Sequence, residues 1–477
     1  MVKVNTMGRI FDARVAPLVV GVLLLGCEGA PPAPPAAGDD GGVFADRSPQ
    51  LGSGDGALVV DPPTEQRDAS PIDAAPDAPL ISGPCGNGVM DPGEMCDDGV
   101  GNDDVTGACS HSCLPLIEWT ARHDGTAHRD DEAAGVAWDP AGFVLVTGSE
   151  GITADDADIW VAKLTSTGGP VWSHTHGGPA ARPDVGQGVA VDISGNVVVN
   201  ATEWLDLRTT AIWTRKYDSA GVEQWTRSYA PGMDAAGGVT TDALGNILVA
   251  GTSSPDITQR AFVRKYSASG NPLWTREISG VSGDSNGTQG IALGPAGSVM
   301  VSGFLSQTRA AFADFWVAQL SSNGADLWSY VDGSTTLVSA TGVAVLGDSA
   351  IACGYAGRDP GSTDVWVRRI DARGQLLWSR EYVRNGPDRC GGIAVDPTTG
   401  DIVVGISEDS GLTLGRAVLR KYDQNGVLRW TRAYRGAAAL GARANAVTIG
   451  ERGVVLVAGT ERTAAGHNDA FVRAFAP

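Results

Sequence analysis

The composition of the chain suits a large, turn-rich all-β body that does not bind nucleic acid. The chain has 477 residues, of which only 19% are charged and 65 are glycine, a balance typical of many short strands joined by tight turns. Its 35 basic and 55 acidic side chains give a formal charge of −20, so a polyanionic partner would be repelled.

Residues 1–27 resemble a bacterial export signal that ends in a lipidation site. Lys3, Arg9 and Arg14 give a basic start, and the apolar run at 16–26 is too short to span a bilayer as a helix. The run ends in Leu-Leu-Gly-Cys, which resembles the lipobox, where the thiol of Cys27 is acylated. The resemblance implies an exported protein that is lipid-anchored to the outer membrane or cell surface. An ordinary signal peptide with an incidental cysteine is the alternative.

Residues 28–84 are predicted to be a disordered linker. They are rich in Pro, Ala, Gly and Asp and nearly lack aromatic side chains, so they cannot bury enough apolar surface to offset the entropy of ordering. A flexible chain of this length reaches roughly 40 Å, which is enough to hold a folded body clear of a membrane.

Residues 85–114 are predicted to form a small disulfide-rich module. Four cysteines in one short exported segment predict two disulfides, with three pairings open; they are Cys85, Cys96, Cys109 and Cys113. The CGNG start, the GEMCDDG centre and the closing CSHSC resemble the Cys-rich repeat of myxobacterial surface proteins.

The acidic side chains of this module offer hard oxygen ligands of the kind that Ca²⁺ prefers. The candidates for a calcium site are Asp91, Glu94, Asp97 and Asp98. Because the ligand spacing of an EF-hand is absent, a solvated acidic loop is the alternative. No other cofactor is expected.

Residues 115–477 carry an internal repeat with the period of propeller blades. A Trp followed by Ser or Thr recurs at separations of 49 to 54 residues, and periods near 50 indicate four-stranded blades. Its seven copies are Trp119, Trp172, Trp225, Trp274, Trp328, Trp378 and Trp430. The signature Gly-(Val/Ile)-(Ala/Thr) recurs with the same period, and each unit holds four short apolar runs, A to D, separated by turns that contain Gly.

The phase of the repeat predicts how the ring closes. The last unit ends after its third strand, and an unmatched copy of the Trp motif at 116–122 precedes the first unit. Pairing this N-terminal strand into the last blade leaves no open sheet edge. The stretch Asp158–Gly178 resembles the bacterial SBBP propeller repeat, a resemblance that implies an architecture and no activity. The predicted fold is all-β: a seven-bladed β-propeller of four-stranded blades closed by an N-terminal strand.

Two further cysteines lie in neighbouring repeats, and the repeated tryptophans are predicted to pack between blades. Cys353 and Cys390 lie in adjacent repeats, where either a third disulfide or two buried thiols would fit. The repeated Trp is predicted to fill the wedge between blades. For the arginines two residues beyond it, we favour blade-to-blade or solvated pairing over ligand binding; they are Arg227, Arg276, Arg380 and Arg432.

One rim of the propeller is predicted to carry the binding site. Strands alternate in direction, so the B to C and D to A connections emerge on one side, and their lengths and chemistry vary. Variable loops on a rigid repeat are where binding usually resides. The candidate rim residues are Asp155, Asp156, His174, His176, Trp204, Arg208, Arg358, Asp359 and His467.

Histidines on this side also offer ligands to a divalent transition metal. The candidates are His123, His128, His174, His176 and His467, together with Asp155, Asp156 and Asp469. No HExxH or similar spacing appears, so solvated rim histidines are the favoured alternative.

No nucleophile elbow, phosphate loop or Ser/His/Asp arrangement is present in the sequence, so no catalytic residue is assigned. The favoured function is a surface-anchored lipoprotein that binds or displays a protein or glycan at the cell envelope and contacts the membrane through its lipid alone. A hydrolase or lyase acting on polysaccharide or peptide is the alternative, because its carboxylates would come from different blades and leave no motif. A structural envelope spacer is the third possibility.

Overall fold

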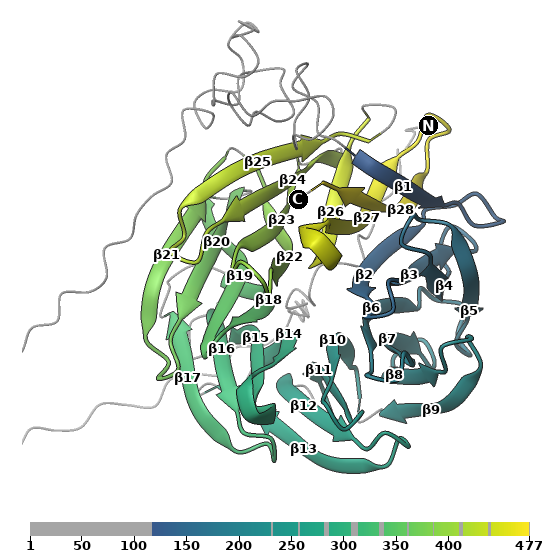
Figure 1. Ribbon diagram of the computed structural model, residues 1–477. Helices are drawn as coiled ribbons and strands as arrows, with labels where there is room; N and C mark the ends of the chain where they lie inside the picture. The colour runs from purple at the N-terminus through teal and green to yellow at the C-terminus, as the bar shows by residue number, and fades with distance from the viewer. Residues whose placement is uncertain are drawn as a thin grey trace, which may run out of the picture. The chain divides into compact units, whose positions relative to one another are not determined.

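The computed structural model describes seven four-stranded antiparallel sheets arranged as blades around a common axis (Figure 1). The residues described are 117–229, 232–255, 258–280, 286–306, 313–332, 338–359, 362–384, 386–409, 414–436 and 440–476. The predicted seven-bladed propeller is therefore confirmed. The predictions for the signal, the linker and the Cys-rich module fall outside these residues.

Each blade runs from strand A beside the axis to strand D at the outer edge of the ring (Figure 1). Blade one is β2 (Glu132–Trp138), β3 (Val144–Gly151), β4 (Ala157–Leu164) and β5 (Pro170–His176); blade two is β6 (Val185–Val191), β7 (Val197–Trp204), β8 (Thr210–Tyr217) and β9 (Glu223–Tyr229). Blade three is β10 (Ala235–Thr241), β11 (Ile247–Ser253), β12 (Arg260–Tyr266) and β13 (Pro272–Ile278); blade four is β14 (Asn286–Leu293), β15 (Val299–Leu305), β16 (Asp314–Leu320) and β17 (Asp326–Asp332). Blade five is β18 (Val338–Leu346), β19 (Ser349–Asp359), β20 (Ser362–Ile370) and β21 (Leu376–Tyr382); blade six is β22 (Arg389–Val395), β23 (Ile402–Asp409), β24 (Leu414–Tyr422) and β25 (Leu428–Tyr434).

Blade seven joins the two ends of the propeller sequence. It holds β26 (Ala442–Ile449), β27 (Val455–Arg462) and β28 (Asn468–Phe475), and its outermost strand is β1 (Ile117–His123). β1 runs antiparallel to β28, with Trp119 opposite Ala474 and His123 opposite Ala470. The predicted closure by an N-terminal strand is thus confirmed.

The hydrophobic core lies between blades. Among the described residues there are seven buried apolar clusters, and each is formed by two neighbouring blades. The cluster at the closure contains Trp160 and Leu164 of blade one and Leu456 and Val472 of blade seven, with Trp119 packed against it. Strands such as β3 and β15 are buried along their whole length because both of their faces are covered. In the part of the chain that is described, no helix is long and apolar enough to cross a membrane.

The glycine signature marks the closest approach of neighbouring blades. The pairing of strand A with strand B shifts register next to this signature in every blade, as a β-bulge does. A Cβ on Gly188 would lie only 3.1 Å from the Val239 nitrogen, and one on Gly290 would lie 2.9 Å from that of Val343. Glycine fits this position in the first six blades because adjacent A strands touch, whereas blade seven has Ala446 there.

Each repeated tryptophan packs against the apolar cluster between its blade and the next, as the sequence predicted, and some of the indoles also bond to the next blade. The indole of Trp172 donates to the Ser219 carbonyl at 3.3 Å, and the Lys163 ammonium donates to the same oxygen at 3.3 Å. Ser219 lies in the C to D turn of blade two, whose Gly221 packs against the same ring. Indole bonds of this kind recur from Trp225 to Ala268, from Trp274 to Ser322 and from Trp378 to Gln424.

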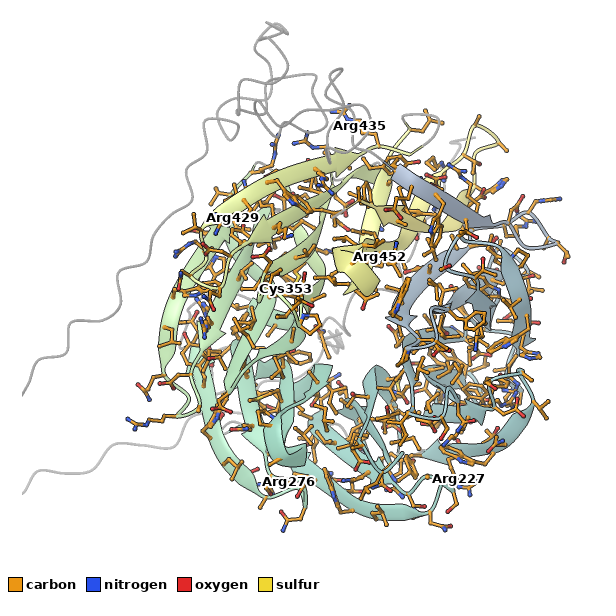
Figure 2. The ribbon with its side chains drawn as sticks, in the orientation of Figure 1. Arg227, Arg276, Cys353, Arg429, Arg435 and Arg452 are labelled. Atoms are coloured by element: carbon orange, nitrogen blue, oxygen red, sulfur yellow. A yellow bond between two sulfur atoms is a disulfide. The ribbon has the colours of Figure 1, made fainter. Side chains whose placement is uncertain are left out.

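The repeated arginines also pair between blades. The Nε of Arg227 donates to the Gly270 carbonyl at 2.7 Å, and that of Arg380 donates to Gly426 at 2.7 Å. Arg276 forms an ion pair with Asp326 of the next blade. Figure 2 shows Arg227 and Arg276 at the outer edge of the ring, where the D strands lie. These contacts agree with the predicted blade-to-blade pairing.

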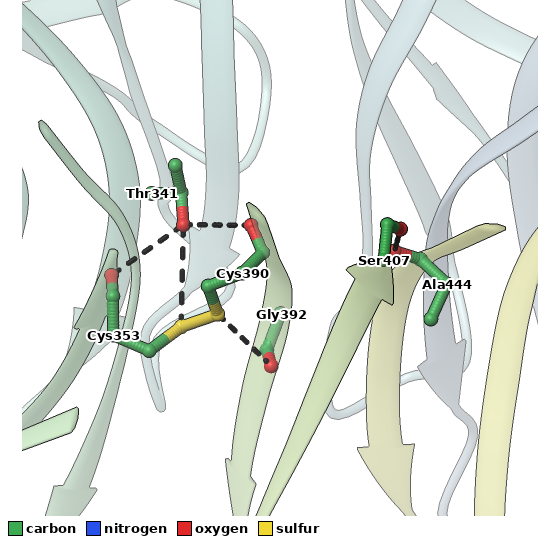
Figure 3. Close-up of a disulfide and its surroundings, with 6 residues drawn as sticks. All are labelled: Thr341, Cys353, Cys390, Gly392, Ser407 and Ala444. Atoms are coloured by element: carbon green, nitrogen blue, oxygen red, sulfur yellow. Dashed lines mark hydrogen bonds between the residues drawn. A yellow bond between two sulfur atoms is a disulfide. The ribbon is translucent and has the colours of Figure 1, made fainter. Parts of the chain in front are cut away.

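Cys353 of β19 and Cys390 of β22 form a disulfide between blades five and six (Figure 3). Their Cα atoms are 6.0 Å apart, and the hydroxyl of Thr341 donates to the Cys390 carbonyl at 2.9 Å. Of the two arrangements that the sequence allowed, the disulfide is the one observed.

Loss of this disulfide is expected to destabilise the propeller by about 2–4 kcal/mol, because the unfolded chain is no longer cross-linked. The bond closes a loop with a sequence separation of 37 residues. Urea unfolding of Cys353→Ala, Cys390→Ala and the double variant measures the loss. All three should lose nearly the same amount, since either change removes the link. Losses that add up across the two sites would instead indicate cavities and contradict this account.

Candidate functional site

A buried carboxylate fixes the loops of the predicted binding rim. In blade two, Asp184 accepts a hydrogen bond from the Trp204 amide at 2.6 Å and another from the Gly178 amide at 2.5 Å. Gly178 lies in a D to A connection and Trp204 ends strand B, so one side chain holds both loops. Asp131 and Asp234 make the same pair of bonds in blades one and three.

The same position is occupied by an amide in blade four. The Oδ1 of Asn286 accepts from the Gly280 amide at 3.0 Å and from the Ser306 amide at 3.1 Å. Asp388 holds the position in blade six, where it is 1% exposed. In each of these blades the residue lies four positions before the residue that begins the signature, a regularity that we did not use in the sequence analysis.

Burial changes the titration of these acids. Burial raises the pKa of Asp184 and of Asp234 to about 6, although hydrogen bonds from backbone amides act to lower it. Burial, together with the nearby negative charge of Glu408, raises the pKa of Asp388 to about 8. The folded protein therefore retains protons that the unfolded chain releases, so its unfolding free energy falls as pH rises from about 4 towards 8.

Asp388→Asn is expected to flatten this pH dependence and to stabilise the propeller at pH 8 by about 1–3 kcal/mol, because a buried charge is removed. Urea unfolding at pH 5, 6.5 and 8 measures the effect. The matched converse, Asn286→Asp in blade four, should add a loss of stability with rising pH. A wild-type stability that does not fall over this range would contradict the assignment.

A second set of contacts joins the last residue of strand D to strand B of the next blade. His123 of β1 bonds to Glu150 at 2.9 Å, and its ring stacks on Trp160 with centroids 4.2 Å apart. His176 of β5 bonds to Glu203 at 2.8 Å in the same way. Both histidines therefore have a carboxylate partner and an aromatic neighbour in the adjacent blade.

Tyrosine replaces histidine at this position in two other blades. Tyr382 donates to Glu408 and Tyr434 donates to Glu461. Arg416 also bonds to Glu408, and Arg122 and Arg473 form ion pairs with Glu461.

The pairing carries a sequence signal that we missed. The first partner lies four residues after the repeated Trp, and the glutamate lies near the end of strand B of the next repeat. In blade three the position of the His or Tyr is occupied by Ile278, and in blade four the position of the glutamate is occupied by Leu305. These two apolar side chains belong to one cluster. The two positions therefore change together, as residues in contact do.

Several predicted rim residues lie on adjacent loops of blades one and two. Asp155 is exposed, and the Asp156 carbonyl closes the loop by accepting from Ile152 and Thr153. Trp204 is partly buried beneath the guanidinium of Arg182, 5.2 Å from its ring. Arg208 is exposed, and its amide donates to Asp206 at 2.7 Å.

Other predicted residues lie apart from this group. His174 is exposed in mid-strand, where its ring stacks on Tyr217 at 5.1 Å near the C to D turn of blade two. Arg358 and Asp359 belong to blade five, where Asp359 pairs with Ser362. His467 lies in blade seven, beside Asp469 and Asp124.

A small cavity lies in the core between blades six and seven. It holds about 10 Å³, space for about one water molecule. Its lining includes Tyr434, Phe471 and Arg473. This cavity is too small for a substrate and belongs to the packing between blades.

Comparison with known proteins does not assign this chain to a family. No protein-family model matches the chain, and no curated protein matches it. Among solved structures, Sqt1 from Chaetomium thermophilum is 14% identical, with a TM-score of 0.43 over 76% of this chain and 99% of that one. The β-propeller domain of the Trilobed protease from Pyrococcus furiosus is 8% identical, with a TM-score of 0.43 over 75% of this chain and 94% of that one. A protein of unknown function from Dyadobacter fermentans is 11% identical, with a TM-score of 0.41 over 76% and 99%. The count of seven blades follows from the strand pairing within this chain.

Proposed function

We propose that this protein is an exported lipoprotein, anchored through Cys27, whose propeller acts as a non-catalytic binding module for a protein or glycan at the cell envelope. The lipobox-like sequence and the linker at 28–84 support export and display. The formal charge of −20 argues against nucleic acid as the partner.

The observation that carries the proposal is the surface formed by the loops of blade two. There Arg182 stacks on Trp204, and Leu207 is 73% exposed beside Arg208. Tryptophan and arginine are enriched among the residues that dominate binding energy. Because Asp184 holds the backbone on both sides, little entropy is lost when a partner docks.

The rim glutamates favour binding over hydrolysis. A glycosidase needs two carboxylates free to face the scissile bond. Glu150 and Glu203 instead bond to histidines of the preceding blade. Glu461 bonds to a tyrosine of the preceding blade and to Arg122 of its own blade. These glutamates therefore hold neighbouring blades together at the rim.

The test is binding of the purified full chain to isolated envelope fragments by biolayer interferometry. We expect saturable binding that Trp204→Ala weakens by about thirtyfold or more, which corresponds to the loss of about 2 kcal/mol expected for a hot-spot residue. The matched control is Leu244→Ala in an A to B turn, where Leu244 is 80% exposed. Fragments treated with protease or with periodate distinguish a protein ligand from a glycan. No saturable binding, or equal loss in both variants, would overturn the proposal.

A further inference from the structure

The loops that meet at the ring closure bring four potential metal ligands together. Asp124 and His128 lie between β1 and β2, whereas His467 and Asp469 lie just before and within the start of β28. One ligand atom from each of Asp124, His467 and Asp469 lies within 4.8 Å of the others. Asp124 and His128 lie beside His467 and Asp469 because β1 pairs with β28.

The distances and atom types suit a divalent transition metal. The Nε2 of His467 lies 3.3 Å from the Oδ1 of Asp469 and 3.7 Å from the Oδ1 of Asp124. The Nδ1 of His128 lies 2.8 Å from the second oxygen of Asp124, and the two imidazole centres are 6.4 Å apart. Imidazole nitrogens combined with carboxylate oxygens bind such ions, and a hydrogen bond to a ligating carboxylate helps to orient it.

One oxygen of the cluster lacks a hydrogen bond. The Asp469 side chain is only 13% exposed, and its Oδ1 accepts no hydrogen bond from the described residues, although the Nε2 of His467 lies 3.3 Å away. Buried carboxylate oxygens in native proteins are nearly always satisfied. The nearby carboxylate of Asp124 adds a second negative charge, so a cation between the two acids would neutralise both.

The backbone holds the ligands in place. The Asp131 amide donates to the Asn468 carbonyl at 2.7 Å, and the Asn468 amide donates to Asp130 at 2.8 Å. The hydroxyl and amide of Thr463 both donate to the His467 carbonyl at 2.9 Å. His128 has a φ of 48°, a conformation uncommon for residues other than glycine that often persists at functional sites.

We propose that Asp124, His467 and Asp469, with His128 beside them, bind a divalent transition metal ion such as Zn²⁺, and that this ion stabilises the closure of the propeller. The ligands come from the two ends of the propeller sequence, so the complete site exists only in the folded ring. An ion that binds only the folded state raises its unfolding temperature.

The experiment uses the full chain, stripped with EDTA and titrated with Co²⁺ as a spectroscopic substitute for Zn²⁺. Nitrogen and oxygen ligands give weak visible bands, whereas thiolates add strong near-ultraviolet absorption, which separates this site from the cysteines. We expect one equivalent of Co²⁺ to bind with weak visible bands and without the strong near-ultraviolet absorption of thiolates. With Zn²⁺ we expect a rise of several degrees in unfolding temperature. His467→Ala should weaken Co²⁺ binding at least tenfold and remove the rise.

Two further variants make the result decisive. Asp124→Asn changes a partly exposed side chain and should lose affinity even if His467→Ala does not fold. His174→Ala removes an exposed histidine elsewhere on the propeller and should bind as the wild type does. Absence of the visible bands, unchanged binding in Asp124→Asn, or equal loss in His174→Ala would overturn the proposal.

Discussion

Deletion of residues 117–123 is expected to leave a protein that does not fold cooperatively. These residues are β1, the outer strand of blade seven, and their loss exposes the whole edge of β28. It also removes Trp119 and Ala121 from the cluster between blades seven and one, and Arg122 from its ion pair with Glu461. An open ring with a long unpaired strand edge is prone to aggregate.

Circular dichroism during heating and size-exclusion chromatography measure the result. The matched control is deletion of seven residues from the segment 28–84, which should leave the unfolding temperature unchanged. A permutant that attaches residues 115–123 after Ala476 should recover folding, because it supplies the same strand from the other end. A β1 deletion that melts at the wild-type temperature would contradict a closed ring.

The overall fold was predictable because the same sequence pattern is repeated seven times along the chain. A repeated Trp or Gly can be compared between copies, so the number of blades, the closing strand and the packing of Trp172 between blades were predicted correctly. The disulfide between Cys353 and Cys390 was allowed by the sequence as one of two arrangements. Local pattern and period carry this information because each of the first six blades is built from four strands that are consecutive in sequence.

The contacts at the rim were harder to predict because they join different repeats. His176 and Glu203 are 27 residues apart, in strand D of one blade and strand B of the next. A repeat period aligns strands within one unit and gives no pairing between residues of neighbouring units. Asp184 was missed for a related reason, since its partners lie on both sides of a blade boundary.

The candidate metal site was predicted only in part. His128, His467 and Asp469 were identified from the sequence, but Asp124 was not, because its place depends on the turn that follows β1. His174 was grouped with the other histidines by its closeness in sequence to a loop. Its side chain instead stacks on Tyr217. His174 and His176 share one face of β5, but His174 lies two residues further from the rim end of that strand.

Asp192→Asn is expected to destabilise the propeller by about 3–5 kcal/mol at neutral pH, because it leaves a buried ammonium without its counter-charge. The Nζ of Lys216 lies 2.8 Å from Asp192, and the two side chains are 4% and 3% exposed. Burial opposes ionisation of Asp192, but hydrogen bonds from Lys216 and Asn196 outweigh it and lower the pKa of this carboxyl. Its contribution is therefore present above pH 4 and is lost as pH falls further.

Blade four supplies the control for this prediction. There the corresponding positions hold Gly294, Ser298 and Gln319, and Gln319 donates to the Ser298 hydroxyl at 2.9 Å. A triple variant with Asp192→Gly, Asn196→Ser and Lys216→Gln copies this neutral arrangement into blade two. Urea unfolding should show that the triple variant recovers most of the stability lost in Asp192→Asn, with a weaker dependence on acid pH. If the triple variant is as unstable as the single one, the loss comes from the turn itself and not from the unpaired charge of Lys216.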